Sequence, residues 1–316
     1  MANLKLISII IPVYNEAQQI AVLIGKIEEF NARYANHQFA FQYIFVDDGS
    51  SDNSFGILKA SVKGLKNYKI IKLSRNFGSH GAIRAGTVQA DGDYVTIIPA
   101  DLQIPLDEIP ALFLKAESGF DVVWVVRESP DIGYIEKVFS NLYSGLMKKY
   151  VNTSFPKEGL ETLIFNTKVK KLFNANMEDN SSFALQIMSY GFTFDFVRIK
   201  KLARKVGKSK WTIHKKIKLM IDSFVAFSFA PIRLVSLVGI IFFLVGCIWS
   251  GYIIFRKLVY NDLSSGWPAM YSTLLLGFGI TNISLGILAE YLWRTLDAAR
   301  RRPVFIIDEI VQETKE

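Results

Sequence analysis

Short apolar runs alternate with longer segments of mixed polarity over the first 126 residues of the chain. Five runs are apolar over nearly their whole length: Ile7–Ile11, Tyr43–Val46, Lys69–Leu73, Tyr94–Ile98 and Val122–Val126. Their alternation with helix-length segments predicts an α/β domain with a doubly wound, mostly parallel sheet. Nearly continuous apolar runs fit strands that helices cover on both faces. Because such sheets bind ligands at the carboxyl ends of their strands, the residues that follow each run are the candidates for function.

Residues 132–150 show apolar positions at helical spacing. The apolar stripe consists of Ile135, Val138, Phe139, Leu142, Leu146 and Tyr150. Lys137, Lys148 and Lys149 fall outside it. This pattern predicts an amphipathic helix. The helix either faces the core of the α/β domain or lies on a membrane surface, since both placements require the same stripe.

Two long uncharged runs occupy the last third of the chain, Leu234–Phe255 and Pro268–Ala289, with 22 residues each. At about 1.5 Å per residue, a helix of this length spans roughly 33 Å, and the hydrocarbon core of a bilayer is about 30 Å thick. The runs therefore predict two transmembrane helices within residues 233–293. Apolar residues at helical spacing in the preceding segment, 212–232, predict an amphipathic helix at the membrane interface.

Basic residues flank these predicted transmembrane helices. The chain has 37 Lys and Arg against 29 Asp and Glu, a net charge of +8. Ten basic residues and no acid lie between Arg198 and Lys218, and Arg294 and Arg300–Arg302 follow the second run. The positive-inside rule places both flanks in the cytoplasm. We therefore expect a multi-pass protein of the inner or plasma membrane, with a cytoplasmic α/β domain over residues 1–211 and a cytoplasmic tail over 294–316.

Polar residues follow three of the predicted strands. Pro12–Glu16 follow the first strand, Asp47–Asp52 follow the second, and Asp101 comes just after the fourth. Asp and Ser also cap helices and Gly relieves tight turns, but the two adjacent carboxylates of Asp47 and Asp48 exceed what one cap requires. An aspartate at this edge of the sheet can share a divalent cation with a diphosphate, and the cation would neutralise a departing nucleotide diphosphate.

Four motifs occur in a fixed order at these strand ends: IIIPVYNE, VDDGSSD, LSRNFG and ADLQ. Together they resemble the inverting nucleotide-sugar glycosyltransferases of family two, which have the GT-A fold. The two predicted transmembrane helices make the chain similar to the polyprenyl-phosphate glycosyltransferases, of the dolichol-phosphate mannose synthase, bactoprenol glucosyltransferase and undecaprenyl-phosphate formamido-arabinose transferase type. The resemblance covers nearly the whole chain, including Gly207–Trp211 and Arg302–Phe305.

The resemblance implies roles for individual residues. The nucleotide-sugar site would comprise Pro12, Tyr14, Glu16, Asp47, Asp48, Arg75, Asn76, Gly78 and Gln103. Asp101 would be catalytic and would bind a divalent metal, Mg²⁺ or Mn²⁺. The acceptor phosphate would meet Arg127, Arg204, Lys208, Ser209 and Lys210. The basic stretch that holds the last four is also what a positive-inside flank at anionic headgroups would look like.

Two departures from the family pattern concern acidic residues. The metal motif is usually Asp-Ala-Asp, but this chain has Pro99-Ala100-Asp101, and the formamido-arabinose transferases carry a serine at the first of these positions. Where relatives read Gly-Asp-Phe-Arg and supply a catalytic aspartate, alignment with the residues that follow puts Glu161, with Glu158 as the alternative. An ionised phosphate acceptor needs positioning more than deprotonation, so Glu161 would orient the acceptor or a cation.

The implied activity is inverting transfer of a sugar from a nucleotide diphosphate, expected to be UDP, to polyprenyl (undecaprenyl) phosphate for cell-envelope glycans. The partners would be the nucleotide sugar, the lipid and the membrane, without nucleic acid, and a homo-oligomer stays open. A dinucleotide-dependent oxidoreductase is excluded because the turn after the first strand lacks Gly-x-Gly-x-x-Gly. A processive synthase would need more membrane helices and a Gln-x-x-Arg-Trp motif. A non-catalytic scaffold that binds the same ligands stays as the alternative.

Overall fold

The computed structural model describes residues 4–35, 39–128, 134–178, 182–199, 230–260, 266–300 and 302–313. The chain divides into two compact units. The first comprises Met1–Ser223 together with Pro303–Glu316, and the second comprises Phe224–Arg302. The first unit is therefore built from two segments of the chain, one before and one after the second unit in the sequence.

The first unit contains a mixed sheet with the strand order β7-β5-β6-β4-β1-β2-β3-β8. The strands are β1 (Lys5–Val13), β2 (Phe39–Asp47), β3 (Tyr68–Leu73), β4 (Tyr94–Ile97), β5 (Val122–Arg127), β6 (Thr162–Asn166), β7 (Phe194–Ile199) and β8 (Ile307–Gln312). The central strands β3, β2, β1 and β4 are mutually parallel, as the sequence predicted. The sheet departs from a parallel one where β6 pairs antiparallel with β4 and β5, and where β8 pairs antiparallel with β3.

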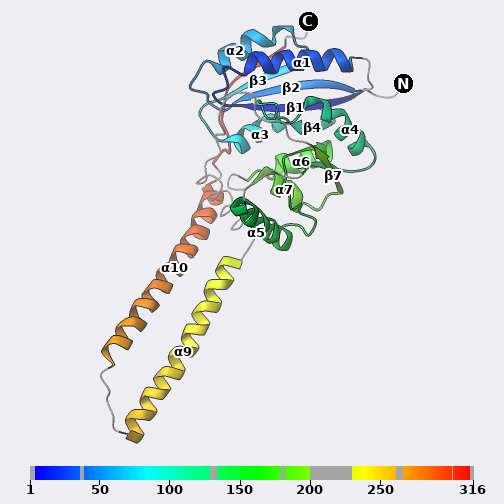
Figure 1. Ribbon diagram of the computed structural model, residues 1–316. Helices are drawn as coiled ribbons and strands as arrows, with labels where there is room; N and C mark the ends of the chain where they lie inside the picture. Colours follow the sequence, from blue (N-terminus) through cyan, green and yellow to red (C-terminus); the bar gives the residue numbers. More distant parts are fainter. Residues whose placement is uncertain are drawn as a thin grey trace. The chain divides into compact units, whose positions relative to one another are not determined.

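Helices cover both faces of this sheet. Those of the first unit are α1 (Ile20–Tyr34), α2 (Ser54–Ser61), α3 (Ser79–Val88), α4 (Ile109–Glu117), α5 (Tyr134–Tyr150), α6 (Thr167–Ala175) and α7 (Phe183–Ser189), with short 3₁₀ turns at Val62–Gly64 and Leu106–Glu108. Figure 1 shows α1 and α2 on one face of the central strands and α3 on the other. Alternate residues of β1 serve the two faces: Ile9 joins the core with α1 and α2, whereas Ile10 contacts α3 at Gly86.

A proline near the end of β1 marks where this strand and β4 separate. The N–H of Ile98 donates to the carbonyl of Ile10 at 2.9 Å, so residues 10 and 12 of β1 turn their backbone groups towards β4. The β1–β4 ladder ends at the pair Ile10 and Ile97, two residues before Pro12. Pro12 has no N–H to donate, and at this position no β4 partner requires one. The carboxyl ends of β1 and β4 are therefore not joined by a ladder.

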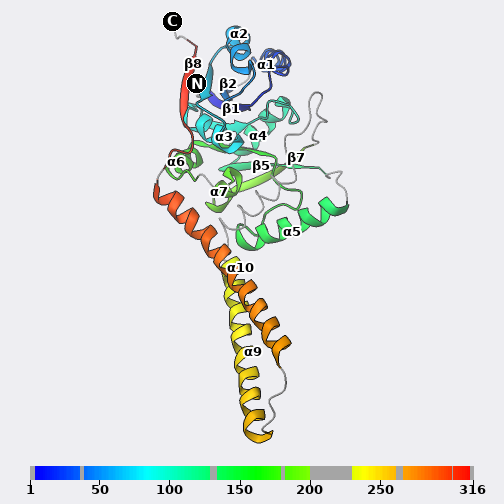
Figure 2. The ribbon, with the colours of Figure 1, turned by 90° about the vertical axis from the view of Figure 1, so that its left-hand side faces the viewer.

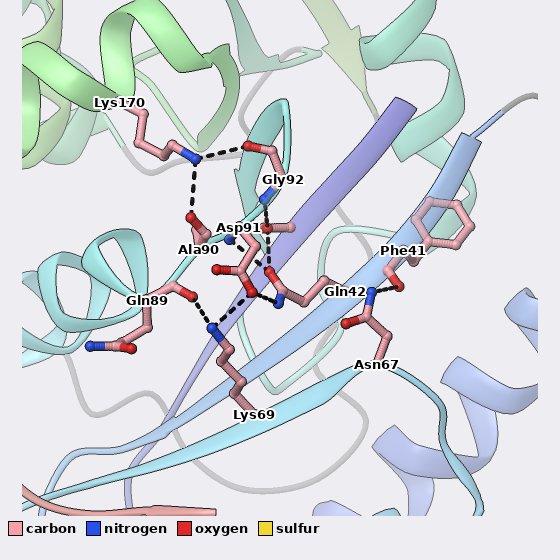
Figure 3. A network of polar contacts seen from close by, with 10 residues as sticks. Phe41, Gln42, Asn67, Lys69, Gln89, Ala90, Asp91, Gly92 and Lys170 are labelled. Carbon is pink, nitrogen blue, oxygen red and sulfur yellow. Dashed lines mark hydrogen bonds and ion pairs between the residues drawn. The ribbon is translucent and has the colours of Figure 1, made fainter. Parts of the chain in front are cut away.

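A polar network fixes the turn between α3 and β4 towards the amino ends of the strands (Figure 3). The side-chain carbonyl of Gln42 accepts from the Ser8 hydroxyl at 2.6 Å, and its amide donates to Asp91 at 2.7 Å. Lys69 forms an ion pair with Asp91 at 2.8 Å. The ammonium group of Lys170 donates to two carbonyls of the same turn, at 3.0 and 2.9 Å. These contacts hold the end of the sheet opposite the predicted site.

The predicted helix over residues 132–150 is present as α5, described from Tyr134 onwards. Met147 is fully buried and Ser144 nearly so, and the Tyr143 ring packs edge-on against Phe155 with 6.0 Å between centroids. The last turns of α5 therefore face the core of the first unit. Placement of its remaining residues on a membrane surface stays a prediction.

The second unit contains the two helices α9 (Ala230–Tyr260) and α10 (Trp267–Arg300). They include the uncharged runs 234–255 and 268–289, so the prediction of helices there is confirmed. Among the residues that the structure describes, no helix meets the length and apolarity required for a membrane span, and the prediction of two transmembrane spans is not confirmed. The interfacial helix predicted over 212–232 lies outside the described residues, except for its last three.

Candidate active site

The turns that follow β1, β2 and β4 meet at the carboxyl edge of the parallel strands. The chain leaves β1 for β2 on one side, while β4 lies on the other side of β1. Neighbouring strands whose connections lead in opposite directions form a crevice, and open α/β sheets bind ligands there. The fold therefore brings the candidate residues Tyr14, Glu16, Asp47, Asp48 and Asp101 to one edge of the sheet.

The side chain of Asn15 joins the turn after β1 to the turn after β2. The side-chain carbonyl oxygen of Asn15 accepts from the N–H of Ser51 at 2.8 Å, and the backbone N–H of Asn15 donates to the Ser50 hydroxyl at 2.9 Å. Asn15 has a φ of 51°, a left-handed conformation that asparagine adopts more readily than most residues. Tyr14 and Glu16 flank it, so this bridge sets their backbone. Asn15 was not predicted as a site residue, because its partners lie 35 and 36 residues away in the chain.

Asp47, the last residue of β2, is completely buried. Its Oδ2 accepts from the N–H of Ser50 at 3.3 Å, whereas its Oδ1 is buried and has no hydrogen-bond partner among the described residues. Burial raises the pKa of this carboxyl, and the nearby hydroxyl and N–H of Ser50 lower it again in part. A buried acceptor without a donor is costly, and such an atom is expected where a ligand supplies the donor.

Asp48 connects this edge of the sheet to the segment Ser74–Gly78, here called the donor loop. The carboxyl Oδ1 of Asp48 accepts from the N–H of Phe77 at 2.7 Å. Burial raises the pKa of Asp48 to about 6, against the opposing effect of hydrogen bonds from the N–H groups of Phe77 and Gly78. Gly78, which has a φ of 85°, ends the loop and precedes α3. The Asp48 carboxyl group thus anchors the loop through the backbone N–H groups of the loop.

Gly49 lets the donor loop approach the turn after β2. Its φ is 63°, and a Cβ atom there would lie 2.4 Å from the carbonyl carbon of Arg75 and 2.7 Å from the nitrogen of Asn76. Only glycine fits against backbone atoms at this distance. The Arg75 guanidinium lies over the Phe77 ring at 4.5 Å, and the side chains of Arg75 and Asn76 are exposed. The predicted residues Arg75, Asn76 and Gly78 therefore belong to one loop beside Asp48.

Asp101 and Gln103 lie on a strained turn after β4. The carboxyl Oδ1 of Asp101 accepts from the N–H of Gln103 at 3.2 Å, and both residues are half-buried. Leu102, between them, has a φ of 50°, which is rare for a leucine and costs free energy. Its N–H donates to the carbonyl of Pro99 at 3.1 Å. Such strain persists only where the surroundings fix the backbone, and strained residues cluster at functional sites.

Arg127 and Glu161 form an ion pair at the carboxyl end of β5. The guanidinium Nε lies 3.2 Å from Oε1 of Glu161, and the two side chains are 29% and 18% exposed. The N–H of Glu161 donates to the carbonyl of Val125 at 2.9 Å, which holds this residue beside the strand end. Of the two acids that the sequence left open, Glu161 is the one that pairs with Arg127. Glu158 lies in a preceding turn and is half-buried.

The second part of the predicted acceptor site comes from the basic segment after β7. Its residues Arg204, Lys208, Ser209 and Lys210 lie outside the described residues. Of the predicted acceptor residues, Arg127 is therefore the one that the structure describes, at the carboxyl end of β5.

The oxygen ligands at this edge of the sheet fit a cation such as Mg²⁺ that binds together with a substrate. The described residues include no cluster of three or more His, Cys, Asp or Glu side chains that could hold a metal by themselves. Mg²⁺ is commonly held by one or two carboxylates plus substrate phosphates and water. A half-buried Asp101 on a fixed turn supplies such a carboxylate. The chemistry of the residues thus matches a cation that arrives with a diphosphate.

The fold and the site define an α/β enzyme with an acidic ligand site in the crevice at the carboxyl ends of β1 and β4, where the strand connections lead in opposite directions. Residues 8–182 match the sequence profile described as Glycosyl transferase family 2. The chain belongs to this family, and it is a glycosyltransferase.

Two relatives match nearly the whole chain. Both are described as undecaprenyl-phosphate 4-deoxy-4-formamido-L-arabinose transferase. The protein from Pseudomonas savastanoi pv. phaseolicola is 30% identical over 316 residues, which are 99% of this chain and 93% of that protein. The protein from Proteus mirabilis is 30% identical over 308 residues, which are 96% of this chain and 94% of that protein.

A solved structure from Mycobacterium tuberculosis is more distant. It is glucosyl-3-phosphoglycerate synthase in complex with Mn²⁺, uridine-diphosphate-glucose and phosphoglyceric acid. Its sequence is 15% identical, the match covers 69% of this chain and 76% of that chain, and the TM-score is 0.47. We draw no functional or structural conclusion from a likeness of this degree.

Proposed function

We propose that this glycosyltransferase moves a sugar from a nucleotide diphosphate sugar to undecaprenyl phosphate, at the cytoplasmic face of a membrane. The product would be a lipid-linked sugar for cell-envelope glycans. The observation that carries the donor half is the gathering of Asp47, Asp48 and Asp101 at the carboxyl edge of the sheet, in the order of a GT-A site. The acceptor half is supported by the relatives above, whose names specify undecaprenyl phosphate and whose similarity spans both units of this chain.

The buried Oδ1 of Asp47 supports a uridine nucleotide as the donor. This oxygen has no donor among the described residues, and a nucleobase with a ring N–H would supply one. Uracil presents one such N–H between two carbonyl acceptors. The turn around Asn15 and the donor loop lie beside Asp47 and would enclose the base and ribose, with Tyr14 and Arg75 as side chains available to contact them.

Asp101 is proposed to bind the divalent cation that accompanies the diphosphate. The cation supplies charge neutralisation to the departing nucleotide diphosphate. Asp101 fixes the diphosphate relative to the sugar, because the turn through Leu102 holds its carboxyl group in place. Gln103, on the same turn, faces the diphosphate or the sugar. The lipid phosphate oxygen attacks the anomeric carbon from the opposite side as the bond to the diphosphate breaks, which inverts the configuration.

The Arg127–Glu161 pair is proposed to receive the phosphate of the acceptor. A phosphate monoester is largely ionised at neutral pH, with a second pKa near 6, so it is already a nucleophile and needs orientation. Arg127 would bind its oxygens, and Glu161 would hold the guanidinium in the required direction before the lipid arrives. The segment with Arg204, Lys208, Ser209 and Lys210 would complete the acceptor site.

Membrane attachment is proposed to involve α9, α10 and the segment before them. Large apolar side chains are exposed along both helices, including Ile240, Leu244 and Ile248 on α9 and Leu285 and Leu288 on α10. Exposed apolar surface of this kind indicates contact with lipid or with another apolar surface. Together with the uncharged runs and basic flanks of the sequence, it supports a chain organised as a cytoplasmic domain over 1–211, an interfacial helix over 212–232, two membrane helices within 233–293 and a cytoplasmic tail.

A donor screen tests this function. The purified full-length protein is incubated with undecaprenyl phosphate, MnCl₂ and, in separate reactions, UDP-, GDP- and CDP-linked sugars, and the lipid fraction is analysed by mass spectrometry. We expect one lipid-linked sugar, formed from a UDP sugar. A product formed only from GDP or CDP sugars would refute the assignment to uridine, and no product from any donor would refute undecaprenyl phosphate as the acceptor.

A further inference from the structure

The chain after α10 returns to the first unit beside the donor loop. β8 is the edge strand of the sheet (Figure 2). It runs antiparallel to β3, and their ladder ends with the pair Leu73 and Ile307. One residue further along the chain from Leu73, the N–H of Ser74 donates to the carbonyl of Ile306 at 3.0 Å. Ser74 is the first residue of the donor loop. The loop therefore begins on a hydrogen bond from the C-terminal segment.

Side chains of the same segment reinforce this attachment. Asp308 forms an ion pair with Lys72 at 2.8 Å, and Lys72 is the β3 residue that lies opposite Asp47 in the ladder with β2. The carbonyl of Val304 comes within 3.6 Å of the place where a Cβ would stand on Gly81, in the first turns of α3. The C-terminal segment thus contacts β3 before the donor loop and α3 after it.

The donor loop in turn holds the acidic edge of the sheet. Its Phe77 N–H donates to Asp48, and its backbone at Arg75 lies against Gly49. The loop thus connects the C-terminal segment to Asp48, and this connection requires no contact between that segment and the nucleotide. An unbroken series of hydrogen bonds and backbone contacts leads from Ile306 through the loop to the turn after β2.

We propose that residues 304–308 are a positioning element of the donor site, which sets the donor loop for nucleotide binding. This inference rests on the proposed nucleotide-sugar donor. Because the segment follows α10 in the chain, the donor loop is hydrogen-bonded to residues that are covalently attached to the helical unit. A change at the end of α10 would then alter nucleotide affinity without contact between the helix and the nucleotide.

Two charge reversals, one in β8 and one directly after it, separate positioning from simple electrostatics. Asp308→Lys places two like charges together beside the donor loop. Glu313→Lys makes the same change at the far end of the strand, where Glu313 accepts from the N–H of Asn67. Added positive charge by itself would strengthen binding of an anionic nucleotide. Loss of positioning would weaken this binding. The two explanations therefore predict opposite changes in the Kd for UDP in Asp308→Lys.

The measurement is UDP binding to the full-length protein in detergent with MnCl₂, by isothermal titration calorimetry. We expect the Kd for UDP to rise about tenfold in Asp308→Lys and to change by less than about twofold in Glu313→Lys. An unchanged or lower Kd in Asp308→Lys would overturn the positioning role. A chain that ends at Pro303 should lose affinity at least as strongly, with a chain that ends at Glu313 as its control.

The folded state of each variant is checked by its melting temperature. If the chain ending at Pro303 does not fold, the comparison of Asp308→Lys with Glu313→Lys decides the question. If the unaltered protein binds no UDP, the titration is repeated with GDP and CDP. Binding of one of these would refute the uridine assignment and leave the positioning role to be decided on that nucleotide, whereas binding of none would contradict the proposed function itself.

Discussion

The contact between Gly49 and the donor loop offers a sharp test of how the site is built. Replacement by alanine adds one methyl group in a place where the structure leaves no room. The new Cβ would lie 2.4 Å from the carbonyl carbon of Arg75, 2.7 Å from its Cα and 2.7 Å from the nitrogen of Asn76. These are backbone atoms, which cannot rotate away as the tip of a flexible side chain can. The loop must therefore move or the turn after β2 must open.

The magnitude has two parts. Alanine in the left-handed region costs about 1–2 kcal/mol, and overpacking of a close contact costs about 1–3 kcal/mol. We expect the free energy of unfolding to fall by about 3 kcal/mol. At about 2–4 °C per kcal/mol for a domain of this size, the melting temperature should drop by about 6–12 °C. Because the moved loop holds Asp48, the Kd for UDP should also rise.

Two other glycines supply matched controls. Gly119 has a φ of 118° but open space around a Cβ, so Gly119→Ala carries only the backbone cost. Gly25 lies in α1 with open space and no left-handed φ, and Gly25→Ala should stabilise the protein by about 0.5–1 kcal/mol. Differential scanning fluorimetry on the full-length protein ranks the three. If Gly49→Ala melts within 2 °C of Gly119→Ala, on the order of the measuring error, then the loop does not press on the turn as described.

Four further substitutions test the rest of the site. Burial raises the pKa of Asp48 in the folded protein to about 6, against 3.8 for an ordinary aspartate. The contribution of this group to stability is therefore present at low pH and is lost as the pH rises from about 4 to about 6. Asp48→Asn should flatten that part of the plot of melting temperature against pH, and an unchanged slope would count against the buried carboxyl. Asn15→Ala removes the bridge between two turns and should raise the KM for the donor severalfold, whereas an unchanged KM would show that the bridge is dispensable. Arg127→Gln and Glu161→Gln should each raise the KM for the lipid while the Kd for UDP stays constant; a change in UDP affinity alone would place the pair in the donor site.

Those parts of the fold that depend on local pattern were predicted from the sequence. The five apolar runs correspond to β1–β5, because each strand is buried on both faces and its composition records that burial. The carboxyl ends of these strands were also predicted as the site, because parallel strands bring their carboxyl ends to one edge of the sheet. The helix over 134–150 was also anticipated from its apolar spacing, although spacing alone did not decide which surface it faces.

Elements that depend on distant partners were missed. β6 and β7 join the sheet through pairings with β4 and β5, and their short runs carry no sign of direction or neighbour. β8 alternates intermediate and exposed residues, as an edge strand does, and its partner β3 lies more than 230 residues earlier in the chain. This segment was predicted to be part of a cytoplasmic tail. The ladder with β3 became apparent only in three dimensions.

The same distinction applies to the site. Asp47, Asp48 and Asp101 stood out because they follow apolar runs, whereas the bridge through Asn15 and the ion pair of Arg127 with Glu161 are long-range contacts. Leu102 could not be singled out, because a left-handed leucine has no signature in composition. Pro99, in place of the usual aspartate of the metal motif, was visible in the sequence; its carbonyl accepts from the N–H of Leu102, a contact that any residue there could make, and nothing in the structure explains the proline itself.

The central claim is that Asp101 lies where a sugar passes from a nucleotide diphosphate to undecaprenyl phosphate. The most direct measurement compares the unaltered protein with Asp101→Ala and Asp107→Ala, an exposed acid paired with Arg33 on the outer surface. Each is supplied with undecaprenyl phosphate, MnCl₂ and the donor found in the screen, and lipid-linked sugar is followed by mass spectrometry. We predict product from the unaltered protein and from Asp107→Ala, and at least a hundredfold lower rate, about 2.7 kcal/mol in activation free energy, from Asp101→Ala. Near-normal turnover by Asp101→Ala, with its melting temperature unchanged, would contradict the account.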